Sequence, residues 1–405
     1  MIQSSIATLV ALLAMAAVTA VLVQRIPIPY VVALAVIGAV VGQFLSAQPI
    51  RLTHSVILFI LLPGLLFEAA FNLKWSHLRD NLVAVLALAT LGVFLTTALA
   101  GLLVHYALGL TLAAAVVFGA IIAPTDPVAV VAVFRRLGAP SRLTNLVEGE
   151  SLLNDGTGVV VFSIALGLVG VAGGFDWLTA SWQFVRLSVG GAGFGLALGL
   201  ALSLLTRRID DPQVEITFTV LAAYGGYLLA ELAGVSGILA VVGAGLVMGN
   251  YGRPRGMSER TQVAVVTFWD YITFLLNSVI FLLIGLDLPA ASLFAHLGLV
   301  VGAFGIATLA RAIAVYGLLA LLRPLGRAVN LRWQTIIVWS GLRGAIATAL
   351  LLSLPEGPAE LALIAPVAYG VVLLSIVVQG ATIGPLTRWM LPHSREHPAA
   401  ADATA

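Results

Sequence analysis

Acidic and polar residues interrupt a long apolar stretch at residues 145–160, NLVEGESLLNDGTGVV. Ionisable side chains at membrane depth cost about 2.5–3.5 kcal/mol each on insertion scales, so they rarely lack a role. On a helix, Ser151 and Asp155 share one face, as do Glu150 and Asn154. The first pair presents a hydroxyl and a carboxylate, which are oxygen ligands suited to a small hard cation, and a carboxylate can also exchange a proton. Asp155 is therefore the first candidate for ion chemistry, and a solvated acidic helix end is the alternative.

A predicted helix break follows from the sequence APTDPVAVV, in which Pro124 and Pro127 bracket Thr125 and Asp126. Proline lacks an amide hydrogen and frees the carbonyl one turn earlier. Within a membrane, such a break is tolerated only where protein or a watery cavity surrounds it. The freed carbonyl of Thr125 is then a candidate cation ligand. Asp126 precedes the second half-helix, where it either supports the site or only caps the helix.

A second break is predicted in WSGLRGAIATAL, where Gly341 and Gly344 flank Arg343 in another apolar run. Two interrupted segments in corresponding places of two halves indicate a transporter site built from inverted repeats. The repeat is visible only in the hydropathy pattern. Arg343 needs a partner at that depth, and Glu150 or Glu148 is the available acid. The alternative is that Arg343 caps the carbonyls of a half-helix.

A further acid, Glu68, lies in the apolar sequence LPGLLFEAAFNL. Its long side chain could reach the membrane surface. The preceding Pro63–Gly64 pair instead indicates a special backbone and favours a site carboxylate. Three other charged residues in or near apolar runs are interpreted as structural pairs or interfacial groups: Arg311, Asp270 and Glu231.

The composition identifies the fold class as an all-α polytopic membrane protein. Of 405 residues, 60% are hydrophobic and 9% charged, whereas soluble domains carry about 25% charged residues. The absence of cysteine excludes thiolate metal sites, and the dispersed basic residues argue against nucleic-acid binding. Apolar runs of about 20 residues can be placed thirteen times: 4–23, 28–46, 52–72, 80–108, 110–135, 144–171, 180–206, 214–232, 235–250, 263–287, 292–322, 331–353 and 362–390.

The distribution of Lys and Arg among the predicted loops supports this number of spans. When alternate loops are assigned to two sides, one side receives 16 basic residues and the other receives only Arg51. The positive-inside rule then places the basic side in the cytoplasm, with the N-terminus outside and the C-terminus inside. The cell membrane, in bacteria the inner membrane, is the expected location.

Six motifs in this order resemble the monovalent cation/proton antiporters of the sodium/proton exchanger group, which comprises NhaP-like antiporters and the eukaryotic sodium/hydrogen exchangers. They cover nearly the whole chain, and TDPVAV followed by GESLLND is the most specific pair. The motifs are LLPGLLFEAAF, APTDPVAVVAVF, EGESLLNDGTGVVVF, FLLIGLDL, GLRGAIATALLLSLP and VVQGATIGPL.

The resemblance implies an elevator-type carrier with two crossed, unwound helices, and a homodimer. A core part over about 80–171 and 292–390 would move against a dimerisation part over about 1–72 and 180–287. Asp155 would alternately bind cation and proton, with Na⁺ as the expected cation and Li⁺ or K⁺ as alternatives, and no resident cofactor is expected. The further cation ligands would be Ser151, Thr125 and Glu68.

Other residue roles are carried by the same motifs. Asn154 would brace the unwound Thr125–Asp126 segment, and Glu150 would pair with Arg343. Relatives with two acids at the Asn-Asp position resemble electrogenic antiporters, so Asn154 implies electroneutral exchange. The family usually has two prolines where this chain has Pro63–Gly64, which is expected to loosen the backbone near Glu68.

Other function classes fit the sequence less well. A cation channel would need a selectivity-filter loop, for which no motif is present. An intramembrane aspartyl protease would need two acids sharing a proton, but Asp126 lies between prolines and a GxGD-type motif is missing. A sodium-driven solute symporter would need a larger pocket of mixed polar groups. A K⁺/H⁺ antiporter stays open, because sequence gives neither cavity size nor ligand field.

Overall fold

The structure is a computed structural model that describes residues 2–23, 28–44, 53–169, 176–288, 290–325, 329–355, 361 and 363–391. These residues form helices and connecting turns, with no strand among them. Four basic residues used to predict the topology lie outside the described residues: Arg25, Arg51, Arg327 and Arg395.

Thirteen helical segments, continuous or interrupted, match the thirteen predicted spans within the described residues. Six described helices are long and apolar enough to cross a membrane by themselves. A different set of segments consists of one uninterrupted α-helix each: α1 Ile2–Val23, α2 Tyr30–Gly42, α9 Ser141–Leu166, α10 Trp177–Thr206, α15 Glu259–Leu286 and α17 Leu297–Leu321.

The other segments contain a π-helical turn or a break. Those with a π turn are α3 His54–Val56 with η1 Ile57–Leu61 and α4 Leu62–Asn72; α5 Trp75–Leu86 with η2 Ala87–Gly92 and α6 Val93–Leu108; α11 Pro212–Val220 with η3 Leu221–Gly225 and α12 Gly226–Leu232; α13 Gly237–Val247 with η4 Met248–Gly252 and α14 Arg253–Gly256; and α21 Ile364–Leu374 with η6 Ser375–Gln379 and α22 Gly380–Met390. The two broken segments are α7 Leu112–Ile122 with α8 Val128–Leu137, and α18 Leu331–Trp339 with α19 Ala345–Leu352. Two short helices, α16 Ala290–Ala295 and η5 Arg323–Leu325, lie in connections.

Polar side chains cap the first turns of several helices, and glycines end others. The Thr111 hydroxyl accepts from the Ala114 amide at the start of α7, and the Asn330 side chain accepts from the Trp333 amide at the start of α18. Gly109 and Gly138 end α6 and α8 with φ of 67° and 64°, a conformation that glycine adopts without strain.

Glycines bring several helix pairs into backbone contact. A side chain at Gly195 would collide with the Ala240 carbonyl between α10 and α13. Gly285 lies in the same way against the Ala35 carbonyl between α15 and α2, and Gly119 against the Thr97 carbonyl between α7 and α6. Such pairs pack closely because small residues let the backbones approach.

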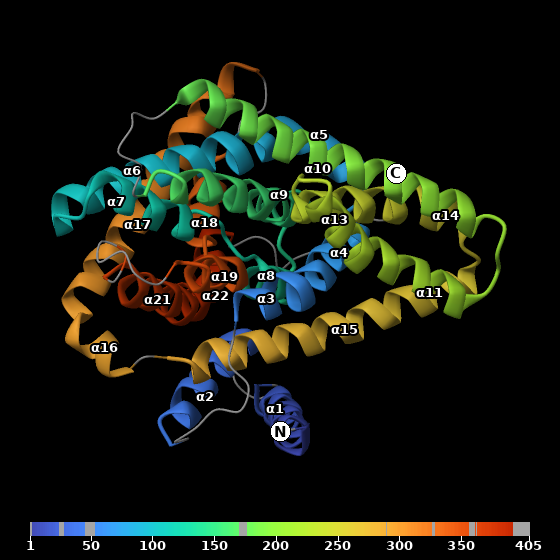
Figure 1. Ribbon diagram of the computed structural model, residues 1–405, viewed down its shortest axis with the longest axis horizontal. Helices are drawn as coiled ribbons and strands as arrows, with labels where there is room; N and C mark the ends of the chain where they lie inside the picture. Colours follow the sequence, from blue (N-terminus) through green and yellow to red (C-terminus); the bar gives the residue numbers. More distant parts are fainter. Residues whose placement is uncertain are drawn as a thin grey trace.

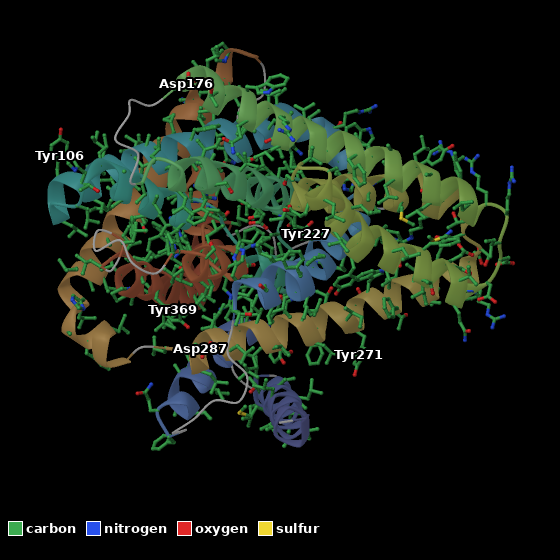
Figure 2. All side chains as sticks on the ribbon, viewed as in Figure 1. Tyr106, Asp176, Tyr227, Tyr271, Asp287 and Tyr369 are labelled. Carbon is green, nitrogen blue, oxygen red and sulfur yellow. The ribbon has the colours of Figure 1, made fainter. Side chains whose placement is uncertain are left out.

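The broken helices lie at the centre of the molecule (Figure 1). There α19 contacts α3 and η1, and α8 contacts α2, while α15 runs below the centre of the view, with α1 lower still. Tyr369 of α21 donates a hydrogen bond to the Ile284 carbonyl near the end of α15, and Figure 2 shows Tyr369 close to Asp287 at that end. The helices thus surround a central region where two backbones are interrupted.

Candidate ion-binding site

The first break separates α7 from α8 at the predicted prolines. Pro127 is the N-cap of α8 and cannot donate a backbone hydrogen bond. The Asp126 side chain accepts from the Val128 amide at 3.0 Å and so caps α8. The Ala345 amide at the start of α19 also donates to Asp126. Asp126 therefore caps two half-helices at once, where a negative charge is favoured.

The second break separates α18 from α19 and touches the first. The Asp126 amide donates to the Leu342 carbonyl at 2.7 Å, so the two interrupted backbones are hydrogen-bonded to each other. The Ser375 hydroxyl accepts from the Arg343 amide at 2.9 Å. Gly344 is required at this crossing because a Cβ there would overlap the Asp126 carboxylate. The crossed, unwound helices predicted from the sequence are confirmed.

A hydrogen-bond network joins the first break to α9. The Ser151 hydroxyl donates to the Thr125 carbonyl at 2.8 Å and lies 3.1 Å from the Thr125 hydroxyl. The Asn154 amide donates to the Thr125 hydroxyl at 2.9 Å and to Glu150 at 2.8 Å, and its oxygen accepts from the Thr125 amide at 3.3 Å. Asn154 therefore contacts the unwound segment on two sides, as an amide can because it both donates and accepts.

Asp155 stands apart from this network. It is 9% exposed, and it forms no hydrogen bond or ion pair with the residues that the structure describes. It lines a cavity of about 290 Å³ that Thr125, Asp126 and Glu68 also line. A carboxylate without a basic partner, beside an unwound backbone, is a group that can bind a cation or a proton.

The cavity brings together three of the four predicted cation ligands, Asp155, Thr125 and Glu68. Ser151 is 1% exposed and does not line it, because its hydroxyl is turned toward Thr125. Glu68 lines the cavity from α4 and accepts a hydrogen bond from Asn72 at 2.6 Å. Arg135 and Glu148 form an ion pair at 3.3 Å on the cavity wall, with the Arg135 side chain 75% exposed. The cavity thus reaches the basic side of the protein at Arg135.

The backbone near Glu68 differs from the prediction. Helix α4 is regular through Glu68, so the expected loosening after Pro63–Gly64 was wrong. Gly64 instead permits close packing, since a Cβ there would lie 2.6 Å from Leu276 and 2.8 Å from the Tyr224 hydroxyl.

The predicted ion pair between Glu150 and Arg343 was wrong, because Arg311 of α17 takes that place. Arg311 donates to both carboxylate oxygens of Glu150, at 3.2 and 3.0 Å, with side-chain exposures of 7% and 2%. Arg343 is fully buried and donates to the carbonyls of Ile122, Gly341 and Ala307. The alternative of capping half-helix carbonyls was the correct one for Arg343.

The other charged residues are structural or exposed. Glu231 accepts from the Gly237 amide at 2.9 Å, which caps α13, and Asp270 is exposed on α15. Thr273 and Asn277 of α15, like Asn72 of α4, are polar residues of the cavity wall that were not predicted from the sequence. The spacing of four residues between Thr273 and Asn277 on an apolar helix was a signal that could have revealed them.

The comparisons with known proteins agree with this architecture. The family model for the transmembrane sodium/hydrogen exchangers matches residues 9–389. The low-affinity Na⁺/H⁺ antiporter NhaS1 of Synechocystis is 41% identical over 360 residues, which cover 88% of this chain and 68% of that protein. The Na⁺/H⁺ antiporter NhaP of Pseudomonas aeruginosa is 40% identical over 81% of this chain and 79% of its own.

A solved structure has the same fold. The sodium/proton antiporter MjNhaP1 from Methanocaldococcus jannaschii superimposes with a TM-score of 0.79 at 23% identity, over 96% of this chain and 99% of that one. This confirms the predicted all-α antiporter fold. The crossed breaks, the cavity and these matches lead to one conclusion: this multi-pass membrane protein is a transporter and not an enzyme, and it belongs to the sodium/hydrogen exchanger family.

Proposed function

We propose that this protein exchanges Na⁺ for H⁺ across the cell membrane, and that Asp155 alternately binds the two ions. The observation that carries the proposal is the lone Asp155 carboxylate on a cavity that also receives the unwound Thr125 segment. The antiporter relatives from Synechocystis and Pseudomonas aeruginosa support the choice of ions. The proposed exchange needs no cofactor beyond the transported ions.

The proposed Na⁺ ligands are oxygen atoms of four residues. Asp155, Thr125 and Glu68 line the cavity. Ser151 does not line the cavity while its hydroxyl donates to the Thr125 carbonyl, so it would have to turn its oxygen toward Asp155 to complete the set. Asp126 and Asn154 hold the unwound segment in place. A K⁺/H⁺ antiporter is the alternative function, because K⁺ takes the same kind of ligands.

We infer a one-for-one, electroneutral exchange because Asp155 is the carboxylate beside the break that has no partner among the described residues, whereas Glu68 accepts from Asn72 and Asp126 caps α8. Asn154 takes the place of a second acid and is fully engaged in hydrogen bonds. The site then carries either one cation or one proton on Asp155, and both loaded forms have the same charge.

We further propose elevator-type movement of a core part, about 80–171 and 292–390, against a dimerisation part, about 1–72 and 180–287. Among the described glycines, no backbone-to-backbone contact joins the two parts: the contact at Gly119 lies within the core part, and those at Gly195 and Gly285 lie within the dimerisation part. Contacts between the parts are made by side chains, such as Leu239 against Gly156. Side-chain contacts can be exchanged during sliding more readily than interlocked backbones.

The remaining proposals concern assembly and orientation. The resemblance to the antiporter group supports a homodimer. The basic-residue distribution supports an external N-terminus and a cytoplasmic C-terminus, so the cavity at Arg135 would open to the cytoplasm.

The test is dequenching of a pH dye in proteoliposomes when Na⁺, Li⁺ or K⁺ is added. The Asp155→Asn variant is expected to lose exchange while it stays folded, because an amide cannot hold the exchanged proton. The matched control is Asp176→Asn, at the exposed N-cap of α10, where asparagine caps equally well. Retention of half the wild-type rate by Asp155→Asn would refute the assignment.

A further inference from the structure

Two polar side chains of α15, Thr273 and Asn277, have no role in the cycle described so far. Both line the cavity that Asp155 and Glu68 line. The Thr273 hydroxyl oxygen is buried and has no hydrogen-bond partner among the residues that the structure describes. Asn277 is 8% exposed, and its side-chain amide forms no hydrogen bond with any residue in the described part of the chain. We call these two residues the α15 pair.

The helix geometry directs the α15 pair toward the cavity. Tyr271 is 60% exposed and points away from the body of the molecule (Figure 2). Thr273 follows two residues later, a rotation of about 200° around the helix, and therefore lies on the inner face. Asn277 lies one turn further along the same face as Thr273. The next polar residue, Ser278, differs because it is hydrogen-bonded to Tyr30 and to the Phe274 carbonyl.

Unpaired polar groups at such a place need an external partner. Leaving a buried hydroxyl or amide unsatisfied is unfavourable, so such groups in a cavity wall usually meet water or a ligand. Hard cations such as Mg²⁺ and Ca²⁺ take about six or more oxygen ligands. The four residues proposed above to bind Na⁺ leave room for additional neutral oxygens, which would not alter the charge of the loaded site.

We propose that the Thr273 hydroxyl and the Asn277 amide oxygen contact the transported cation, or the water that it retains, from the wall opposite Asp155. The inference rests on the cation/proton exchange proposed above. Helix α15, which lies outside the moving core part, would therefore contribute to the affinity for the cation.

The two walls belong to different parts of the molecule, which gives the inference a directional consequence. Asp155 lies in the proposed core part, and α15 lies in the proposed dimerisation part. After the core has moved, Asp155 no longer faces the same section of α15. The α15 pair therefore acts on the cation only when the site is open on the basic side, where Arg135 lies.

The experiment measures the KM for Na⁺ separately on the two sides. The natural chain has no cysteine, so Arg208→Cys, at an exposed position after α10, introduces a single reactive thiol. Proteoliposomes that bind a thiol-reactive resin have the basic side outward, and those that do not bind have it inward. In this background, the Thr273→Val/Asn277→Leu variant removes both oxygens at nearly constant volume.

In the bound vesicles the KM for external Na⁺ should rise about tenfold in this variant, the effect of one or two lost polar contacts. In the unbound vesicles the KM should change less than twofold. Thr273→Ser alone should stay near the natural value because it keeps the hydroxyl. The matched control is Thr267→Val, an exposed threonine of the same helix that does not line the cavity.

An unchanged KM on the basic side, or an equal rise on both sides, would overturn the inference. If the double variant does not transport, its melting temperature in detergent is measured with and without Na⁺, and a Na⁺-dependent rise as large as that of the natural protein would overturn it as well. Failure of the natural protein to exchange Na⁺ for H⁺ would instead refute the proposed function.

Discussion

Breaking the buried pair between Glu150 and Arg311 should destabilise the protein strongly. Nη1 and Nη2 of Arg311 donate to Oε1 and Oε2 of Glu150, and both side chains are almost fully buried. Removing one partner leaves a buried charge without compensation, which costs about 3–5 kcal/mol. Glu150→Gln and Arg311→Met each remove one charge while they keep most of the side-chain volume.

The size of the expected shift in melting temperature follows from the chain length. An unfolding entropy of about 2.1 cal/mol/K per residue gives about 0.85 kcal/mol/K for 405 residues. A loss of about 3–5 kcal/mol then lowers the melting temperature by about 4–6 °C.

A double-mutant cycle in detergent tests the identity of the partner. The Glu150→Gln/Arg311→Met double variant should recover at least half of the summed losses, because no lone charge remains. Glu150→Gln/Arg343→Met should show the plain sum, since Arg343 donates to carbonyls and not to Glu150. The reverse pattern, with recovery for Arg343 and additivity for Arg311, would refute the pairing described here.

Three further predictions follow from the site. If Asp155 carries either one cation or one proton, both loaded forms have the same charge, so the turnover rate in proteoliposomes should not vary with a membrane potential clamped by valinomycin. A strong dependence would contradict one-for-one exchange. In the proposed mechanism protons compete with Na⁺ for Asp155, so the apparent Na⁺ affinity should weaken by about tenfold for each unit that the pH falls once the carboxyl is mostly protonated. An affinity that is constant over a pH series would exclude a shared site. Gly344→Ala should destabilise the fold by about 1–3 kcal/mol, because its Cβ would overlap Asp126. Gly298→Ala is its control, because a Cβ at Gly298 would have no neighbouring heavy atom within 4 Å. Equal melting temperatures for the two variants would contradict the close contact between Gly344 and Asp126.

The sequence was sufficient to predict the parts of the site that depend on local backbone chemistry. Pro124 and Pro127 cannot continue a helix, and this places Thr125 and Asp126 in an unwound segment whatever surrounds them. Helical spacing likewise places Ser151 and Asp155 on one face of α9. These features were recognisable because a few residues determine each of them.

The features that could not be predicted depend on how helices distant in sequence pack together. Arg311 and Arg343 both lie within apolar runs, and nothing in their spacing shows which one reaches Glu150. Only the packing of α17 against η2 and α6 decides this, because it brings the Arg311 side chain to Glu150, 161 positions away in the sequence. The direction of the Ser151 hydroxyl, toward Thr125 and away from the cavity, also depends on a neighbour in three dimensions.

The absence of a basic partner for Asp155 among the described residues bears on whether the carrier can return empty and dissipate an ion gradient. No basic side chain in the described part of the chain forms an ion pair with it. In the proposed elevator cycle, the core part bears a negative charge whenever Asp155 holds neither ion, and this charge is costly to carry across an apolar interface. The empty carrier is therefore expected to stay on the side where it released its ion until another ion arrives. An arginine beside Asp155 would remove this restraint and let the carrier return empty, so that one ion gradient could run down without building the other.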